Sequence, residues 1–258
     1  MVAAIAVLMS AALLTWGMRG RLFHKYVPPE KKPVKKDTVN RTIMYDSVLV
    51  KKFKIVSQHF NPNNTVFTYS GTINMVDGAD TTVKVKNVSF LFCRQNNDTY
   101  TKTGDAETLN AHGIYLYIEH DHKRVIVSSQ KKIDDQQPLP DMSKLVENLR
   151  SEKYQMRNKI NGKNETISII NEHHITCKEY AITFDTVTNQ VNHLRIRLTN
   201  FNEPLNRNKE KVIDISMGTF NKSANIEQYI NTDKILIKAG NDWKLRAPYL
   251  DYELIKLP

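Results

Sequence analysis

The sequence lacks the short motifs that mark the common enzyme classes. It contains no G-x-S-x-G elbow, no H-E-x-x-H helix, no phosphate-binding P-loop and no G-x-G-x-x-G dinucleotide fingerprint. Carboxylates such as Asp185, Asp214 and Glu253 are scattered among strand and turn patterns, so the sequence does not pair an acid with a base. These absences predict a protein that is not an enzyme and that needs no cofactor.

Cysteine is nearly absent, because Cys93 and Cys177 are the only two in 258 residues. Each lies within a predicted strand, in different halves of the chain. A disulfide between them would close a long loop and stabilise the fold by about 2–4 kcal/mol. The alternative is two separate buried thiols that pack as small apolar residues. We favour separate thiols, because nothing in the sequence indicates that the two lie close together.

Acidic residues are fewer than basic ones, at 27 against 37, which gives a formal charge of +10 and a pI near 9.4. Such a balance makes nucleic acid or an anionic membrane surface a conceivable partner. Beyond the first 40 residues, however, lysines and arginines are interspersed with acidic residues and do not gather around exposed aromatics. The pattern is typical of a solvated surface and does not predict nucleic-acid binding.

Charge is missing altogether from the first 18 residues, MVAAIAVLMSAALLTWGM. A membrane-spanning helix needs about 17–25 apolar residues, and Trp16 lies where an interfacial aromatic is common. No clean small-x-small cleavage site follows, and no cysteine is there to accept a lipid. We therefore predict an uncleaved N-terminal membrane anchor at 1–18, with a cleaved signal segment as the alternative.

Residues 19–41 contain three prolines and many lysines, which predicts an extended basic tether between the anchor and the domain. Its lysines could contact anionic headgroups or simply be solvated. By the positive-inside rule this charge would place the domain in the cytoplasm. The composition of the domain, and the resemblance described below, favour instead a single-pass protein of the bacterial inner membrane with its domain in the periplasm.

Residues 42–258 are expected to form a single β-rich domain. Leu49, Phe53, Val56 and Phe60 follow helical spacing, with Asp46 or Ser47 as the N-cap. Alternating or continuous apolar runs then predict mostly antiparallel strands. We place them at 67–75, 83–93, 114–119, 124–129, 165–171, 176–184, 191–199, 211–217, 234–238 and 249–257.

One long helix is predicted between the two groups of strands, from Asp141 to Ile160. Met142, Leu145, Leu149 and Met156 keep near-helical spacing after the Pro138-Leu139-Pro140 break. A single-faced helix must bury its apolar stripe against the sheet or cover an opening. The expected class is α+β, an antiparallel β-sheet curved into an incomplete barrel with helices covering one side.

Several predicted strands carry apolar residues on both faces, which is more than a one-sided sheet needs. Either both faces are covered, or one face lines a site for an acyl chain. Core packing is the commoner explanation for any single residue. If one face does bind a ligand, the candidate ligand-binding residues are Phe67, Tyr69, Phe90, Phe92, Leu116, Leu145, Leu149 and Ile196.

Four histidines form a weak candidate for a metal site. His120 and His122 would share a face on a strand, and His173 and His174 could complete a metal site. The first pair lies at a turn among charged neighbours, and no ligand spacing recurs elsewhere. We expect exposed turn histidines and no metal.

From about residue 43 to 258 the order of elements resembles the lipoprotein-carrier family of LolA and LolB and its Bacteroidetes-type relatives. The resemblance is carried by FTYSGTINM, VSFLFCRQNNDTY, IYLYIEHDHKRVIVSS, AITFDTVTNQV and DYELIKL. It implies an incomplete barrel with a helical lid, whose apolar interior shelters lipoprotein acyl chains without a cofactor. The apparent anchor and the lack of a lipidated cysteine depart from the family's carrier and receptor, which puts a lipoprotein-sorting role in doubt.

Two functions follow from these patterns. The first is a membrane-tethered extracytoplasmic binding or carrier domain for a lipid or other apolar ligand. The alternative is a non-enzymatic structural or interaction subunit of a cell-envelope assembly, with envelope proteins as partners. A carrier needs an apolar binding surface, whereas an assembly subunit needs an exposed patch or an open strand edge.

Overall fold

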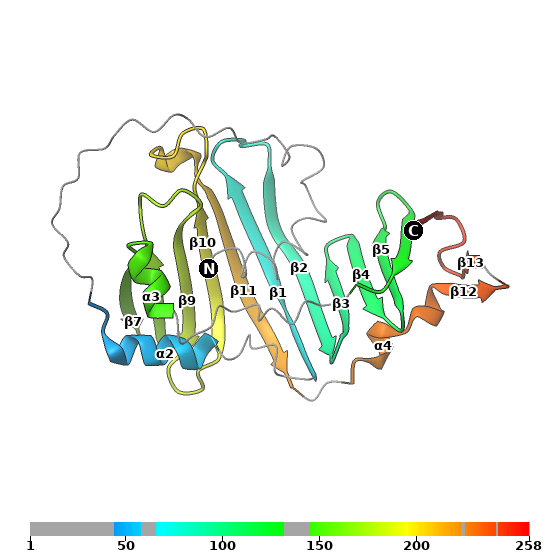
Figure 1. Ribbon diagram of the computed structural model, residues 1–258, viewed down its shortest axis with the longest axis horizontal. Coiled ribbons are helices and arrows are strands. Elements are labelled where there is room, and N and C mark those ends of the chain that lie inside the picture. Colours follow the sequence, from blue (N-terminus) through cyan, green and yellow to red (C-terminus); the bar gives the residue numbers. More distant parts are fainter. Residues whose placement is uncertain (1–43, 58–65, 132–144, 223–224, 241, 258) are drawn as a thin grey trace.

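A twelve-stranded curved sheet dominates the computed structural model, which describes residues 44–57, 66–131, 145–222, 225–240 and 242–257 (Figure 1). The strand order is β14-β6-β5-β4-β3-β2-β1-β11-β10-β9-β8-β7. Neighbours are antiparallel except β14 and β6, which are parallel. Because β14 and β7 end the order without pairing, the sheet is an open, incomplete barrel. The expected α+β class is confirmed.

The strands of the large sheet are β1 Val66–Asp77, β2 Lys84–Gln95, β3 Asp98–Thr103, β4 Ala106–Ala111, β5 Ile114–Glu119, β6 Arg124–Ser129, β7 Gln155–Asn161, β8 Asn164–Ile170, β9 Cys177–Asp185, β10 Val191–Leu198, β11 Lys211–Asn221 and β14 Glu253–Lys256. A small hairpin is formed by β12 Leu236–Ala239 and β13 Asp242–Leu245. The helices are α2 Ser47–Ser57, α3 Leu145–Ser151 and α4 Glu227–Ile230, with short 3-10 turns at Arg207–Lys209 and Thr232–Lys234. No described helix is long and apolar enough to cross a bilayer, and the predicted anchor lies outside the described residues.

Helix α2 begins where its sequence predicts. The side chain of Asp46 accepts a hydrogen bond of 2.8 Å from the backbone N–H of Val48, and its carbonyl accepts one of 3.0 Å from Val50. Asp46 therefore caps the first turn. The predicted apolar positions Leu49, Phe53 and Val56 are buried, whereas Phe60 lies outside the described residues.

The prediction of a long helix at 141–160 is wrong. Helix α3 ends at Ser151, and Met156 and Ile160 lie on β7, while Asp141 and Met142 fall outside the described residues. Lys153 has φ +58°, Tyr154 N–H donates to the Leu149 carbonyl and Lys153 N–H donates to that of Arg150. This is a Schellman end, in which a left-handed residue stops the helix, and here lysine occupies the position that is usually glycine.

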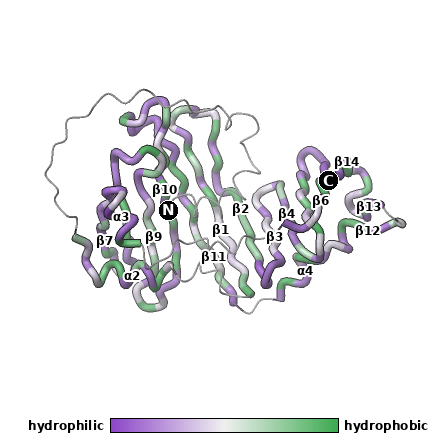
Figure 2. The backbone as a smooth tube through the Cα atoms, viewed as in Figure 1, coloured by the Kyte–Doolittle hydropathy of each residue, from purple (hydrophilic) through white to green (hydrophobic). Residues whose placement is uncertain are grey.

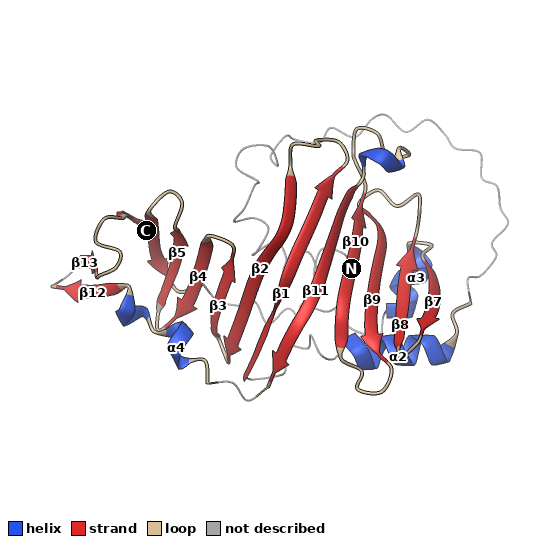
Figure 3. Cartoon of the chain, turned by 180° about the vertical axis from the view of Figure 1, so that it is seen from behind, coloured by secondary structure: helices blue, strands red, loops and turns tan. Residues whose placement is uncertain are grey.

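Two apolar cores lie on opposite faces of the sheet. The α2–α3 core comprises Leu49, Phe53, Val56, Ile73, Val85, Phe90, Leu145, Leu149, Tyr154, Ile167, Ile169, Cys177, Tyr180, Ile182, Phe184, Val191, Leu194, Ile196, Ile213 and Ile215. The α4 core comprises Cys93, Tyr100, Leu109, Ala111, Leu116, Ile118, Val125, Val127, Ile226, Ile230, Ile235 and Leu236. Figures 1 and 3 show α2 and α3 at the β7–β10 end and α4 at the other.

Strand β2 is the point at which the buried face changes. Successive side chains on a strand point to opposite faces. Phe90 belongs to the α2–α3 core, whereas Leu91 and Cys93 pack in the α4 core. The run Phe90-Leu91-Phe92-Cys93 is therefore continuously apolar because each face of β2 meets a different core, while hydrophobic and hydrophilic residues mix along the other strands (Figure 2). Helices consequently pack on both faces of the sheet, whereas the sequence predicted one side.

Candidate functional site

Five aromatic rings gather on the face of β1, β2 and β11 that also carries the α2–α3 core. We call Phe67, Tyr69, Phe90, Phe92 and Phe220 the aromatic cluster. The ring centroid of Tyr69 lies 5.2 Å from that of Phe92 and 5.8 Å from that of Phe90. The centroid of Phe67 lies 6.0 Å from that of Tyr69, 5.7 Å from Phe92 and 6.1 Å from Phe220. These spacings are within the range of favourable ring contacts.

Strand register brings the rings together. Tyr69 on β1 is opposite Phe92 on one side and Phe220 on the other, so all three project from the same face. Gly71 is opposite Phe90, and a Cβ at Gly71 would lie 2.8 Å from the Phe90 ring and 2.1 Å from the Ser216 carbonyl oxygen. The Phe90 ring thus lies against bare backbone, and only glycine leaves it that room.

Burial is uneven across the aromatic cluster. Phe67 and Phe90 are 6 % and 9 % exposed, whereas Tyr69, Phe92 and Phe220 are only half-buried. Burial raises the pKa of Tyr69 further above physiological pH, so the hydroxyl stays neutral there as an ordinary tyrosine would. The cluster therefore offers uncharged aromatic rings, two of them buried and three partly open, with the Lys222 ammonium 5.8 Å from the centroid of the Phe220 ring.

Seven of the eight candidate ligand residues lie on this face of the sheet or on helix α3, which packs in the same core. Phe67, Tyr69, Phe90 and Phe92 are in the aromatic cluster, and Leu145, Leu149 and Ile196 lie deeper in the α2–α3 core. Leu116 is the exception, because it is fully buried in the α4 core on the opposite face. The structure thus brings the aromatic candidates together and separates Leu116 from them.

Phe220 is a member of the cluster that the sequence pattern did not indicate. The predicted strand stopped at 217, because Gly218 interrupts the apolar pattern there. In the structure β11 continues to Asn221 through an irregularity opposite Tyr69 and Gly71. A β-bulge of this kind shifts the alternation by one residue, and glycine within a strand is the signal that could have indicated it.

Both cysteines are free, and they lie in different cores. Burial raises the pKa of each thiol to about 12, so both stay protonated and unreactive at neutral pH. The structure therefore has Cys93 and Cys177 as separate buried thiols.

The histidines have protein partners rather than one another. His120 lies 3.0 Å from Glu107 through Nε2 and 3.0 Å from the Tyr252 hydroxyl through Nδ1. The imidazole of His174 accepts hydrogen bonds from the backbone N–H groups of Thr176 and Cys177. Among the described residues no group of His, Cys, Asp and Glu is arranged to hold a metal ion.

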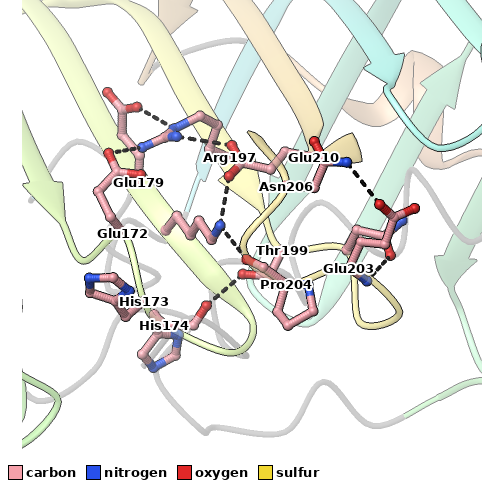
Figure 4. A network of polar contacts seen from close by, with 12 residues as sticks. Glu172, His173, His174, Glu179, Arg197, Thr199, Glu203, Pro204, Asn206 and Glu210 are labelled. Carbon is pink, nitrogen blue, oxygen red and sulfur yellow. Dashed lines mark hydrogen bonds and ion pairs between the residues drawn. The ribbon is translucent and has the colours of Figure 1, made fainter. Parts of the chain in front are cut away.

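A buried ion network lies apart from the aromatic cluster, at the ends of β9 and β10 (Figure 4). Glu210 bonds Lys178 at 2.8 Å and Arg197 at 2.9 Å, and all three side chains are at most 4 % exposed. Lys178 also donates to the Pro204 carbonyl at 2.6 Å, and Arg197 to Glu179 at 2.8 Å. Each charge is paired, as buried charges must be, so the network fixes the loop between β10 and β11.

A shallow open depression lies near the C-terminal segment, lined by Asn231, Asp233, Lys234, Arg246, Ala247 and Pro248, with a volume of about 520 Å³. It does not include any residue of the aromatic cluster. Its charged rim and open shape suit a solvated surface better than an apolar ligand.

No protein-family model matches the chain, and no curated protein is significantly similar to it in sequence. The chain has a low-grade structural resemblance to LolA-type proteins. A LolA superfamily protein from Nitrosomonas europaea is 9 % identical, with a TM-score of 0.29, over 74 % of this chain and 99 % of that one. A putative outer membrane lipoprotein-sorting protein domain from Vibrio parahaemolyticus is 9 % identical, with a TM-score of 0.31, over 71 % and 96 %. An uncharacterized conserved protein from Thermus thermophilus is 6 % identical, with a TM-score of 0.41, over 80 % and 99 %. Values this low transfer no function.

Proposed function

We propose that the chain is a membrane-tethered, extracytoplasmic binding or carrier domain for a lipid or other apolar ligand, and that the aromatic cluster is its binding surface. The observation that carries the proposal is that Tyr69, Phe92 and Phe220 are only half-buried beside the buried rings of Phe67 and Phe90. Aromatic side chains can each bury roughly 150–250 Å². A ligand that covers the half-buried rings would remove apolar surface from water. This favours binding by about 25 cal/mol for each Å² that becomes buried.

The neighbourhood of the cluster supports an apolar ligand. Met217, opposite Gly71, is half-buried and packs on the α2–α3 core, so the apolar surface continues from the cluster into an aliphatic side chain. Phe67, Tyr69 and Phe92 lie on strands of the sheet rather than on loops. A surface on rigid elements is already ordered before binding, which lowers the entropic cost of taking up a ligand.

The location belongs to the same proposal. The uncharged segment 1–18 would hold the chain in the bacterial inner membrane, and residues 19–41 would let the domain reach lipids on the periplasmic side. Envelope proteins that give or receive the ligand are the expected partners. Protease added outside intact spheroplasts should digest the domain, and complete protection would place it in the cytoplasm instead.

A tryptophan placed in the cluster tests the binding site directly. The native Trp16 and Trp243 are first replaced by phenylalanine, and Phe92→Trp then serves as a reporter in the full chain held soluble by amphipol. A fatty acid brominated along its chain quenches tryptophan only on close contact. We expect saturable quenching at this position.

The matched control is Tyr229→Trp in the same background. Tyr229 is also half-buried and aromatic, but it stacks on Tyr100 in the α4 core, with ring centroids 5.4 Å apart. It should not be quenched. Equal quenching at both positions, or none at either, would refute the proposed site and favour the interaction-subunit function.

A further inference from the structure

A buried hydroxyl without a partner lies beside the aromatic cluster. Thr103, at the end of β3, is 4 % exposed, and its Oγ1 has no hydrogen-bond partner among the residues that the structure describes. Thr103 is opposite Phe90 on β2, so its side chain projects from the same face as the cluster. Buried polar groups nearly always have a partner, and leaving one unpaired costs folding free energy.

Thr103 is one of four threonines on this face of β3 and β4. Thr101 is opposite Phe92 on β2 and Thr108 on β4, and Thr99 is opposite Arg94. We call Thr99, Thr101, Thr103 and Thr108 the threonine strip. Thr101 and Thr103 are paired directly with Phe92 and Phe90. The strip therefore begins on the strand next to the aromatic cluster, about 4.8 Å away, which is the spacing between neighbouring strands.

Charged groups border the strip, and each makes a contact of its own. Arg94 donates through Nε to the Asn96 carbonyl, and the Lys131 ammonium lies 3.6 Å from the centroid of the Tyr115 ring. Glu119, on the neighbouring β5, accepts a hydrogen bond from Tyr117 at 3.2 Å and is 6 % exposed. The strip itself consists only of hydroxyl groups, each of which can donate one hydrogen bond and accept others.

We infer that the threonine strip binds the uncharged headgroup of an amphiphile whose hydrocarbon chain lies on the aromatic cluster. This rests on the proposed function and narrows it to a ligand class, acyl chains that end in an ester, amide or hydroxyl group. The carbonyl or hydroxyl of such a headgroup pairs with Thr103 Oγ1. A pure hydrocarbon leaves that oxygen unpaired.

The Phe92→Trp reporter measures this selectivity by competition. In the full chain, monolauroylglycerol or dodecane displaces the brominated fatty acid and restores fluorescence. For each variant we take the ratio of the two concentrations that restore half of the fluorescence. A change in the apolar surface affects both competitors alike and therefore leaves this ratio unchanged. We expect Thr103→Val, which is nearly isosteric, to shift that ratio against monolauroylglycerol by about threefold to tenfold, which is the loss of one hydrogen bond.

The control is Ser57→Ala, which removes the other buried unpaired hydroxyl found in the described part of the chain, at the end of α2 rather than on the strands of the site. It should leave the ratio unchanged, and thermal unfolding should show both variants to be at least as stable as the parent. An unchanged ratio in Thr103→Val, with the reporter still quenched, overturns the headgroup site alone. A reporter that is never quenched overturns the proposed function itself.

Discussion

At the scale of single residues, position within the aromatic cluster should decide what each ring does. Phe90 is buried against the Gly71 backbone, whereas Phe92, two residues further along β2, is half-buried. Phe90→Ala should therefore destabilise the fold by about 3–5 kcal/mol, as large-to-small core changes do. Phe92→Ser should cost much less stability but weaken the binding of an apolar ligand at least tenfold. Urea unfolding and ligand titration check the pair, and an unfolded Phe92→Ser chain would mean that this ring is core.

The carboxylate of Glu165 makes the free energy of unfolding depend on pH in the acid range. Burial alone would raise the pKa of Glu165, but hydrogen bonds from Lys52 at 2.7 Å and Asn158 at 3.0 Å hold the pKa below its ordinary value. The unfolded chain takes up this proton near pH 4.3, and the folded chain only at lower pH. The stabilisation is thus complete above about pH 4.3 and is lost as the pH falls through the folded pKa.

The corresponding variant is Glu165→Gln. It should be less stable than the parent at pH 7, and the difference in the free energy of unfolding should shrink as the pH falls from about 5 to about 3. Urea titrations at several pH values measure this. A difference that does not vary with pH would show that the carboxylate charge contributes nothing.

At the scale of elements, the ion network holds the loop between β10 and β11. Glu210→Gln removes the shared partner of Lys178 and Arg197. Arg197 keeps its ion pairs with Glu172 and Glu179, but the buried ammonium of Lys178 is left with the Pro204 carbonyl and no carboxylate. We expect a loss of about 3–5 kcal/mol in the free energy of unfolding. Glu203→Gln in the same loop is the control, because Glu203 is exposed and its carboxylate accepts a hydrogen bond from the nearby Asn206. Similar losses in both variants would contradict this role for the network.

Elements with strong periodicity were predictable, and those with polar sequences were not. The hairpin of β5 and β6 was placed at its observed bounds, because two apolar runs flank a short polar turn. Strands β3 and β4, DTYTKT and AETLNA, have few apolar residues, since one face of each carries the threonine strip. The end of α3 could not be predicted from the sequence, because Lys153 adopts a left-handed conformation that is unusual for lysine.

At the scale of the whole molecule, two cores on opposite faces of one sheet were not predictable. The sequence did show apolar residues on both faces of β2, but only the register shows that each face belongs to a different core. The same ambiguity placed Leu116 among the ligand candidates. Of the candidate site, the four aromatic residues came from the sequence, whereas Phe220 and the threonine strip required the structure.

Because the two cores are separate, we expect them to contribute independently to the free energy of unfolding. Leu116→Ala in the α4 core should destabilise the fold by about 2–5 kcal/mol and leave ligand affinity unchanged. Combined with Ile196→Ala in the α2–α3 core, the two losses should add within about 0.5 kcal/mol, because the residues belong to different cores. Denaturant unfolding of the single and double variants measures this, and a large coupling energy would show that the sheet transmits strain between its faces.

The most direct test of the central claim is native mass spectrometry of the full chain after gentle detergent extraction from its own membrane. We predict a discrete lipid-sized adduct on the parent chain, released by organic solvent, and its loss in Phe92→Ser although that variant stays folded. A parent chain that carries no adduct, or an adduct equally abundant in Phe92→Ser, would contradict a lipid-binding function at the aromatic cluster.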